Sequence, residues 1–205
     1  MIKVIIFDLW NTLQYKRYKK GSARWMWKHF GKKMSYRRIL KSYEKNFQLD
    51  KSDDFEKKYR NMFKELKLPY TSALIKKYAL YRRKMEARGY VYSYTVPLLK
   101  KLRKKGYKIA LLSNITHFHA RRLLKLKVHR GIDKFFFSFR LGSLKPKLRN
   151  FKKVLSYFNI KPHEALMIGD SYHDDIIPSR KLGMKAIHFK GGEKLKKELK
   201  RIKVL

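Results

Sequence analysis

The sequence contains no cysteine and no long apolar run. The absence of cysteine excludes a disulfide framework and a thiolate metal site, and it suits a reducing compartment. No apolar stretch approaches the roughly 20 residues that a membrane-spanning helix needs. Asp8 interrupts the short apolar run near the start of the sequence, which is therefore not typical of a secretory signal. We expect a soluble cytoplasmic protein with no membrane partner.

Acidic residues are scarce: 15 Asp and Glu stand against 54 Lys and Arg, which gives a formal net charge of +39. Such a surface attracts polyanions and steers anionic substrates. Basic residues interleaved with aromatic ones are typical of proteins with a nucleic-acid or nucleotide partner. Lysine-rich helix faces are also common in basic or thermophilic proteomes, where the lysines only keep the helix surface solvated. Because the basic residues are spread along most of the chain, we favour the second interpretation and leave nucleic acid as the alternative.

Several short apolar runs predict the strands of a parallel sheet. Nearly continuous hydrophobic runs are typical of strands that are buried on both faces. The runs are Lys3–Asp8, Lys108–Asn114, Phe135–Phe139, Ala165–Asp170 and Lys185–Phe189. Apolar stripes at helical spacing lie between or after them, within residues 96–102, 151–158 and 195–202. Strands that alternate with helices indicate an α/β fold with a Rossmann-like parallel sheet and flanking helices.

Residues 15–92 interrupt this alternation. The segment is dense in Lys, Arg and Tyr, it has no clear strand, and its apolar residues recur at helical spacing. Pro69 separates two helical stretches within it. We therefore predict a core domain of residues 1–14 and 93–205 and an inserted α-helical domain of residues 15–92.

Polar side chains stand at the ends of three of the predicted strands: Asp8, Ser113 and Asp170. A single strand-end Asp is as easily explained as a helix cap or turn residue. In an open parallel sheet, however, ligands bind beyond the carboxyl ends of the strands, where these three side chains would meet. The pattern therefore predicts one site built from three strand ends.

Four segments around these residues, in this order, resemble the motifs of the haloacid dehalogenase superfamily of aspartate-nucleophile hydrolases. The segments are Asp8-Leu9-Trp10-Asn11-Thr12-Leu13, Leu112-Ser113-Asn114, Lys145-Pro146, and Gly169-Asp170-Ser171 with Asp175 beyond it. The resemblance covers about residues 1–14 and 94–190. It implies a Rossmann-like core and, as in subfamily I of the family, a helical cap inserted after the first motif.

The resemblance also implies a hydrolase that acts on a small phosphorylated substrate. Asp8 would be the nucleophile and would form an aspartyl phosphate. Mg²⁺ would be the cofactor, in a metal site made by Asp8, Asp170, Asp175 and the backbone carbonyl of Trp10.

Four more roles follow from the resemblance. Lys145 would be catalytic, since its charge would neutralise the nucleophile and the phosphoryl oxygens. The Ser113 hydroxyl and the Asn114 backbone N–H would bind the transferring phosphoryl group. Asp175 and Asp174 are candidates for orienting Lys145 or a metal-bound water.

Trp10 departs from the family pattern. Most phosphatases of the family carry an Asp at this position, which protonates the leaving oxygen. An indole cannot do so, although it would still shape the substrate pocket. Three interpretations remain open: a phosphatase that is slow or selects good leaving groups, a 2-haloacid dehalogenase-like enzyme, or a weakened enzyme kept as a nucleic-acid-binding protein. Dehalogenases of the family also have an aromatic residue here, but they lack acidic residues such as Asp170 and Asp175, so we favour the phosphatase.

Two further groups lie close to the motifs in sequence. His117 and His119 follow the second motif, where they would either contact the site or be ordinary surface histidines, and the second alternative is favoured. Aromatic residues of the insert would form its interior or contact an aromatic substrate, and the first alternative is favoured. They are Trp25, Trp27, Tyr36, Tyr43 and Tyr59.

Overall fold

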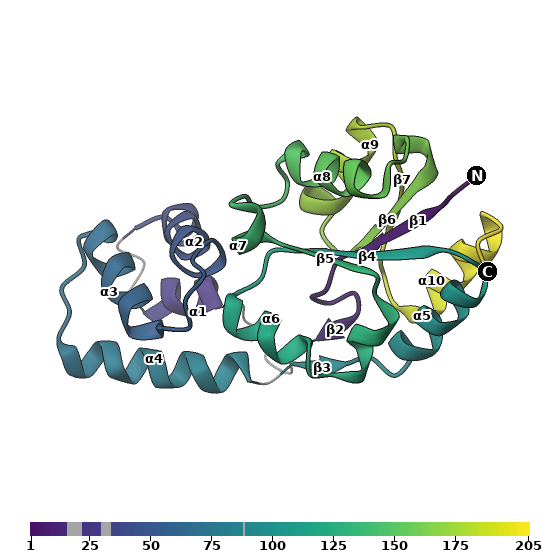
Figure 1. Ribbon diagram of the computed structural model, residues 1–205. Coiled ribbons are helices and arrows are strands. Elements are labelled where there is room, and N and C mark those ends of the chain that lie inside the picture. The colour runs from purple at the N-terminus through teal and green to yellow at the C-terminus, as the bar shows by residue number, and fades with distance from the viewer. Residues whose placement is uncertain (16–21, 30–33, 88) are drawn as a thin grey trace.

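The computed structural model of the chain consists of a helix-flanked sheet and a separate group of helices (Figure 1). The structure describes residues 1–15, 22–29, 34–87 and 89–205. Among these residues, no helix has the length and apolar composition needed to cross a bilayer.

The sheet has five strands, and every neighbouring pair is parallel. Strand β1 (Val4–Phe7) lies in its centre. On one side follow β4 (Lys108–Ser113) and β5 (Lys134–Phe137), and on the other β6 (Ala165–Gly169) and β7 (Lys185–His188). The predicted Rossmann-like α/β fold with a parallel sheet is therefore confirmed.

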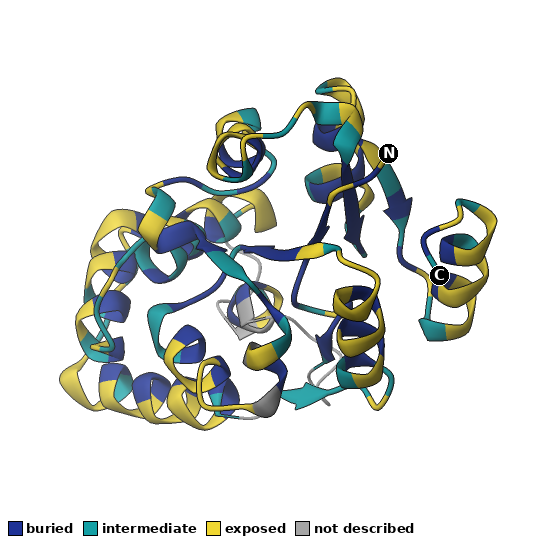
Figure 2. Ribbon diagram, turned by 45° about the vertical axis from the view of Figure 1, so that its right-hand side comes forward, coloured by how far each residue is buried: buried dark blue, intermediate teal, exposed yellow. Residues whose placement is uncertain are grey.

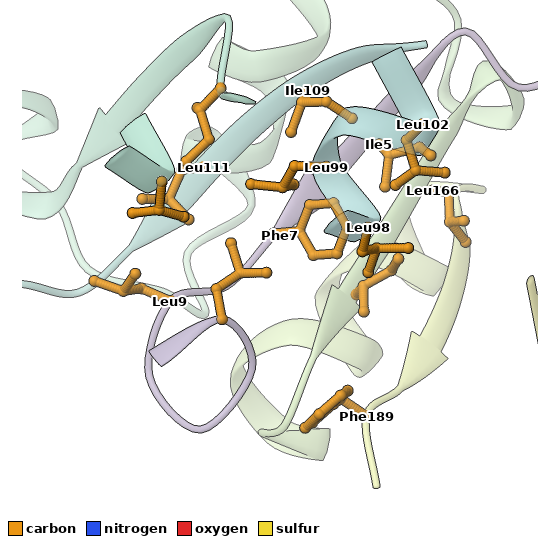
Figure 3. Packing of buried hydrophobic residues seen from close by; sticks show 14 of the residues in the cluster. Ile5, Phe7, Leu9, Leu98, Leu99, Leu102, Ile109, Leu111, Leu166 and Phe189 are labelled. Carbon is orange, nitrogen blue, oxygen red and sulfur yellow. The ribbon is translucent and has the colours of Figure 1, made fainter. Parts of the chain in front are cut away.

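Alternate residues of β1 enter the cores on opposite faces of the sheet. Ile5 and Phe7 belong to the larger cluster, which Figure 3 shows packed against Leu98, Leu99 and Leu102. Side chains of three helices complete this layer: α5 (Thr95–Lys104), α6 (His117–Leu123) and α10 (Gly192–Arg201).

Val4 and Ile6 point to the other face, where side chains of α8 (Leu148–Phe158) pack against them. Helix α9 (Ile177–Lys181) comes later in the chain. Since both faces of β1 are covered, its four residues are all buried, as its continuous apolar run predicts. Figure 2 shows the same pattern in the helices, whose buried positions face inward and whose exposed positions face solvent.

The predicted strand at Phe135–Phe139 differs from the observed one. Strand β5 begins at Lys134 and ends at Phe137, and Ser138 starts the short helix α7 (Ser138–Leu141). The Ser138 hydroxyl explains the change, because it accepts a hydrogen bond from the Ile115 backbone N–H at 3.1 Å outside any strand ladder. The remaining short elements of the core are η2 (Lys127–Gly131), η3 (Pro162–Glu164) and η4 (Tyr172–Ile176).

The helical insert packs around a hydrophobic cluster of its own, which includes Met26, Phe47 and Phe63. Its elements are α1 (Ser22–His29), α2 (Tyr36–Tyr43), the π-helical turn η1 (Glu44–Gln48), α3 (Phe55–Leu66) and α4 (Ser72–Glu86). Pro69 lies between α3 and α4, as predicted. Tyr43 and Tyr59 are buried in the cluster and Trp27 packs against it, whereas the Trp25 side chain lies outside the described residues.

Two short strands at the ends of the insert were not predicted. Strand β2 (Gln14–Tyr15) pairs antiparallel with β3 (Tyr90–Val91). Two-residue strands are too short to show any periodicity, so the sequence pattern could not indicate them. The domain boundaries at residues 14/15 and 92/93 remain predictions.

Candidate active site

The candidate site lies at the carboxyl edge of the sheet, where several strands end together. Asp8 directly follows β1, and its backbone N–H donates to the Ile168 carbonyl of β6 at 2.9 Å. Ser113 is the last residue of β4, and Asp170 follows β6. Parallel topology thus brings together segments that are far apart in sequence.

Lys145 joins two of the site carboxylates. Its Nζ donates to Asp8 Oδ1 at 2.6 Å and to Asp175 Oδ1 at 2.5 Å. Asp8 and Lys145 are each 6% exposed, and Asp175 is fully buried. Buried charges are tolerated where they are paired and hydrogen-bonded, and the three groups meet that requirement for one another.

The site is built to carry negative charge that one lysine does not fully balance. Burial raises the pKa of Asp8 to about 7, and Asp175 and Asp170 add to this rise while Lys145 opposes it. Burial also raises the pKa of Asp170, which the Asn11 amide partly offsets. Burial alone would lower the pKa of Lys145, but Asp8 and Asp175 outweigh it and the pKa rises. An added cation would therefore be stabilised here.

Asp8, Asp170 and Asp175 have the geometry of a metal site. Each offers a carboxylate oxygen, and these oxygens lie within 4.8 Å of one another. Asp170 is oriented by Asn11, whose Nδ2 donates to Asp170 Oδ2 at 3.0 Å. A set of carboxylate oxygens is the donor chemistry that suits a hard divalent cation such as Mg²⁺.

Asp175 is positioned by its own loop. Its Oδ2 accepts the Ser171 backbone N–H at 3.1 Å, and its side chain lies directly against Gly169. A Cβ at Gly169 would come within 2.2 Å of Asp175 Oδ2, so only glycine fits there. Asp174 points elsewhere: its carboxylate is partly exposed and pairs with His173 Nδ1 at 2.8 Å. Of the two predicted candidates for orienting Lys145, the structure places only Asp175 against it.

Asn114 fixes the segment that carries Lys145. Its Oδ1 accepts the Lys145 backbone N–H at 2.9 Å, and its Nδ2 donates to the Lys145 carbonyl at 3.2 Å. The neighbouring Ser113 hydroxyl is buried and has no hydrogen-bond partner within the part of the chain that the structure describes. Buried hydroxyls are rarely left unpaired, so Ser113 Oγ is available to a ligand.

Trp10 lies two residues after Asp8 and is half-buried, with its ring tilted against that of His119 at 4.3 Å between centroids. His119 is 2% exposed, so its predicted surface position is wrong. Its Nδ1 lies 3.0 Å from the Glu86 carbonyl and its Nε2 3.1 Å from Gln14 Oε1. Both ring nitrogens thus have polar neighbours inside the protein. His117 is partly exposed and bonds to Asp53 at 2.8 Å.

The π-helical turn η1 of the insert reaches the site, which sequence reasoning missed. Figure 1 shows the end of α2, which η1 continues, close to α7. Gln48 Nε2 lies 3.5 Å from the Asn114 carbonyl, and the Ser138 hydroxyl donates to the Gln48 carbonyl at 2.7 Å. Burial raises the pKa of Glu44, and the negative charge of Asp174, a residue of the core, raises it further. These residues belong to no recognisable motif, so the sequence offered no signal for them.

Known proteins resemble this chain in sequence and in fold. The sequence model of the haloacid dehalogenase-like hydrolases matches residues 2–183. A glyceraldehyde 3-phosphate phosphatase of Pyrococcus abyssi is 27% identical over 205 residues, which cover 94% of this chain and 83% of that protein. One from Methanothermobacter thermautotrophicus is 33% identical over 94 residues, 45% of this chain and 42% of the relative. In that match the chain spans less than half the length of its relative.

Solved structures show the same fold. A HAD family enzyme from Bacteroides thetaiotaomicron has a TM-score of 0.68 at 21% identity, and the match covers 93% of this chain and 95% of that one. A structure of the same enzyme in complex with magnesium and inorganic phosphate has a TM-score of 0.64 at 21% identity, over 94% and 96% of the two chains.

Proposed function

The chain belongs to the haloacid dehalogenase-like hydrolases, and we propose that it is a Mg²⁺-dependent phosphomonoester hydrolase that works through an aspartyl phosphate on Asp8. One observation carries the proposal: Lys145 bridges Asp8 and Asp175 at 2.6 and 2.5 Å, beside the carboxylate of Asp170. A nucleophilic carboxylate next to a phosphate needs this positive charge to lower their mutual repulsion.

The relatives support a small phosphorylated substrate. Those reported above are named glyceraldehyde 3-phosphate phosphatases, and one structural neighbour was crystallised with magnesium and inorganic phosphate. In this chain Asp8, Asp170 and the backbone carbonyl of Trp10 would hold Mg²⁺, and Asp175 beside them is a further candidate ligand. The ion, when bound, would supply charge that stabilises the phosphoryl oxygens.

The first half-reaction would use the groups at the sheet edge. A carboxylate oxygen of Asp8 attacks phosphorus, and the bond from phosphorus to the leaving oxygen breaks. Lys145 stays charged and neutralises Asp8 and the phosphoryl oxygens, and Asp175 keeps its Nζ in place. The Ser113 hydroxyl and the Asn114 backbone N–H donate to the phosphoryl group.

The second half-reaction would return the enzyme to its starting state. Water attacks phosphorus, the bond to Asp8 breaks, and inorganic phosphate leaves. The leaving oxygen of the first step takes its proton from solvent, because Trp10 has no acidic proton to give. General acid catalysis is worth about 10²–10⁴-fold, so the enzyme would favour substrates whose leaving group needs no protonation, such as aryl or acyl phosphates.

We propose that residues 15–92 act as a cap over this site. The contacts of η1 with Asn114 and Ser138 support a role for the insert in covering the phosphoryl pocket. Caps of this kind exclude water and contact the organic part of a substrate.

The test is phosphate release from p-nitrophenyl phosphate and a panel of small phosphomonoesters, with Mg²⁺ and with EDTA. We expect Mg²⁺-dependent turnover that Asp8→Asn abolishes. Turnover that persists in Asp8→Asn would contradict an aspartyl phosphate. Halide release from 2-chloropropionate without any phosphate release would instead support the dehalogenase-like alternative.

A further inference from the structure

The turn η1 presents one face to the core domain and one to the insert, and it exposes Lys45 to solvent. In a π-helix the hydrogen bonds run from i to i+5, so Glu44 and Gln48 lie about one turn apart on the same face. Phe47 is buried in the hydrophobic cluster of the insert. Asn46 also points inward, since its Nδ2 donates to the Ser42 carbonyl at 2.9 Å and to Glu65 at 2.8 Å. Glu44 and Gln48 are thus the polar side chains that η1 directs toward the core.

Gln48 is anchored to the core through its backbone. Its carbonyl accepts the Ser138 hydroxyl at 2.7 Å, and Ser138 is itself 1% exposed and bonded to the Ile115 backbone N–H at 3.1 Å. The anchor holds the Gln48 side chain at Asn114, the residue that clamps the Lys145 segment. The side chain therefore sits beside the groups that would bind a phosphoryl group.

The contact with Asn114 fixes which way the Gln48 amide points. Its Nε2 faces the Asn114 carbonyl, and a carbonyl can only accept, so Oε1 must point away. Gln48 Oε1 is buried and has no hydrogen-bond partner among the residues that the structure describes, and the same holds for Ser113 Oγ. One atom belongs to the residue before Asn114 and the other to the residue that contacts the Asn114 carbonyl, so both mark a place near Asn114 where a ligand completes the hydrogen bonding.

The two atoms require different hydrogen-bonding groups on a ligand. Ser113 Oγ can donate, which suits a phosphoryl oxygen, whereas Gln48 Oε1 can only accept and suits a hydroxyl or ammonium group. We propose that Gln48 is a specificity-determining residue, whose Oε1 accepts a hydrogen bond from a donor on the organic part of the phosphomonoester. The proposal rests on the phosphatase function above. The substrate would carry a hydroxyl or ammonium group close to its phosphoester.

The experiment compares three phosphomonoesters of similar size: glycerol 3-phosphate, which has hydroxyls, O-phosphoethanolamine, which has an ammonium, and propyl phosphate, which has neither. We expect wild type to prefer one donor-bearing ester over propyl phosphate in kcat/KM by about tenfold or more, because an acceptor left buried and unpaired penalises the other substrate. The ester preferred tells which donor the site takes.

Gln48→Met keeps the size of the side chain and removes the acceptor, so it should reduce that preference to near unity. Asn46→Ala, in the same turn but directed into the insert, should leave the preference unchanged. An equal fall in kcat/KM for all three esters in Gln48→Met would show a merely structural role and overturn the proposal.

A binding measurement separates this proposal from the function on which it rests. Calorimetric titration of the Asp8→Asn protein with the three esters, in Mg²⁺, needs no turnover. A wild type without phosphatase activity would refute the proposed function, while a binding preference that Gln48→Met removes would still support the acceptor. Equal binding of the three esters, or no binding of any, would overturn it.

Discussion

Lys145 and Asp175 form a buried ion pair, with Nζ and Oδ1 2.5 Å apart, and the same Nζ holds Asp8 at 2.6 Å. Asp175 is therefore tied to Asp8 through one shared cation. Because Asp175 contacts Lys145 directly, we assign it a role in positioning the lysine. Four predictions follow from the way in which the site is supported.

Asp175→Asn should lower kcat by about 10–100-fold, the range typical of groups that support a metal or charged site. The amide cannot balance Lys145, so the lysine loses one of its two ionic partners and the stability of the protein should fall by about 3–5 kcal/mol. Steady-state kinetics and urea unfolding measure the two effects. Asp174→Asn is the matched control, because that carboxylate is partly exposed and pairs with His173. Equal losses in both variants would contradict the assigned positions.

Gly169→Ala should have an effect similar to that of Asp175→Asn. A Cβ would meet the Asp175 carboxylate at 2.2 Å and push it from Lys145. A double-mutant cycle tests the cause: the same change made in an Asp175→Ala protein should cost much less activity and stability, because the clashing group is gone. Additive losses would mean that Gly169 acts through something other than Asp175.

Trp10→Asp should raise kcat for alkyl phosphates by about 10²–10⁴-fold, the range of general acid catalysis. The gain should be smaller for p-nitrophenyl phosphate, whose leaving group needs less protonation. Trp10→Asn is the control for lost packing against His119, since Asn matches Asp in size and has no proton to transfer. If Asn and Asp variants behave alike, the missing acid does not limit turnover.

The place of Asp8, Ser113 and Asp170 at one edge of the sheet could be predicted from the sequence, because each stands at the end of a buried apolar run and parallel strands end at a common edge. Lys145 and Asp175 came from the motif resemblance, and the structure adds the contact between them. The other contacts around the site depend on packing between elements that are far apart in sequence.

Gln48 and His119 show why these contacts could not be predicted from the sequence. Gln48 approaches a residue 66 positions away, and His119 bonds to Gln14, 105 positions away. Helical spacing tells which face of a helix is apolar, but not which polar side chain of an insert will meet the core. The buried position of His119 is set by the Glu86 carbonyl and Gln14, neither of which any local pattern indicates.

The pH dependence of metal binding provides the last prediction. Without metal, burial raises the pKa of Asp8 to about 7, so below that pH the carboxyl holds a proton that it must release before it can bind Mg²⁺. The apparent Mg²⁺ affinity should therefore fall about tenfold for each pH unit below about 7 and level off above it.

Calorimetric Mg²⁺ titrations between pH 5.5 and 8.5 measure this dependence, and proton release into buffers of different ionisation enthalpy counts the proton directly. Asp8→Asn should bind Mg²⁺ more weakly and lose most of the pH dependence, because its amide does not titrate. Asp174→Asn should keep the wild-type profile. A wild-type affinity that stays flat down to pH 5.5 would show that Asp8 is already ionised in the metal-free protein, and that Lys145 outweighs the effect of burial on the Asp8 carboxyl.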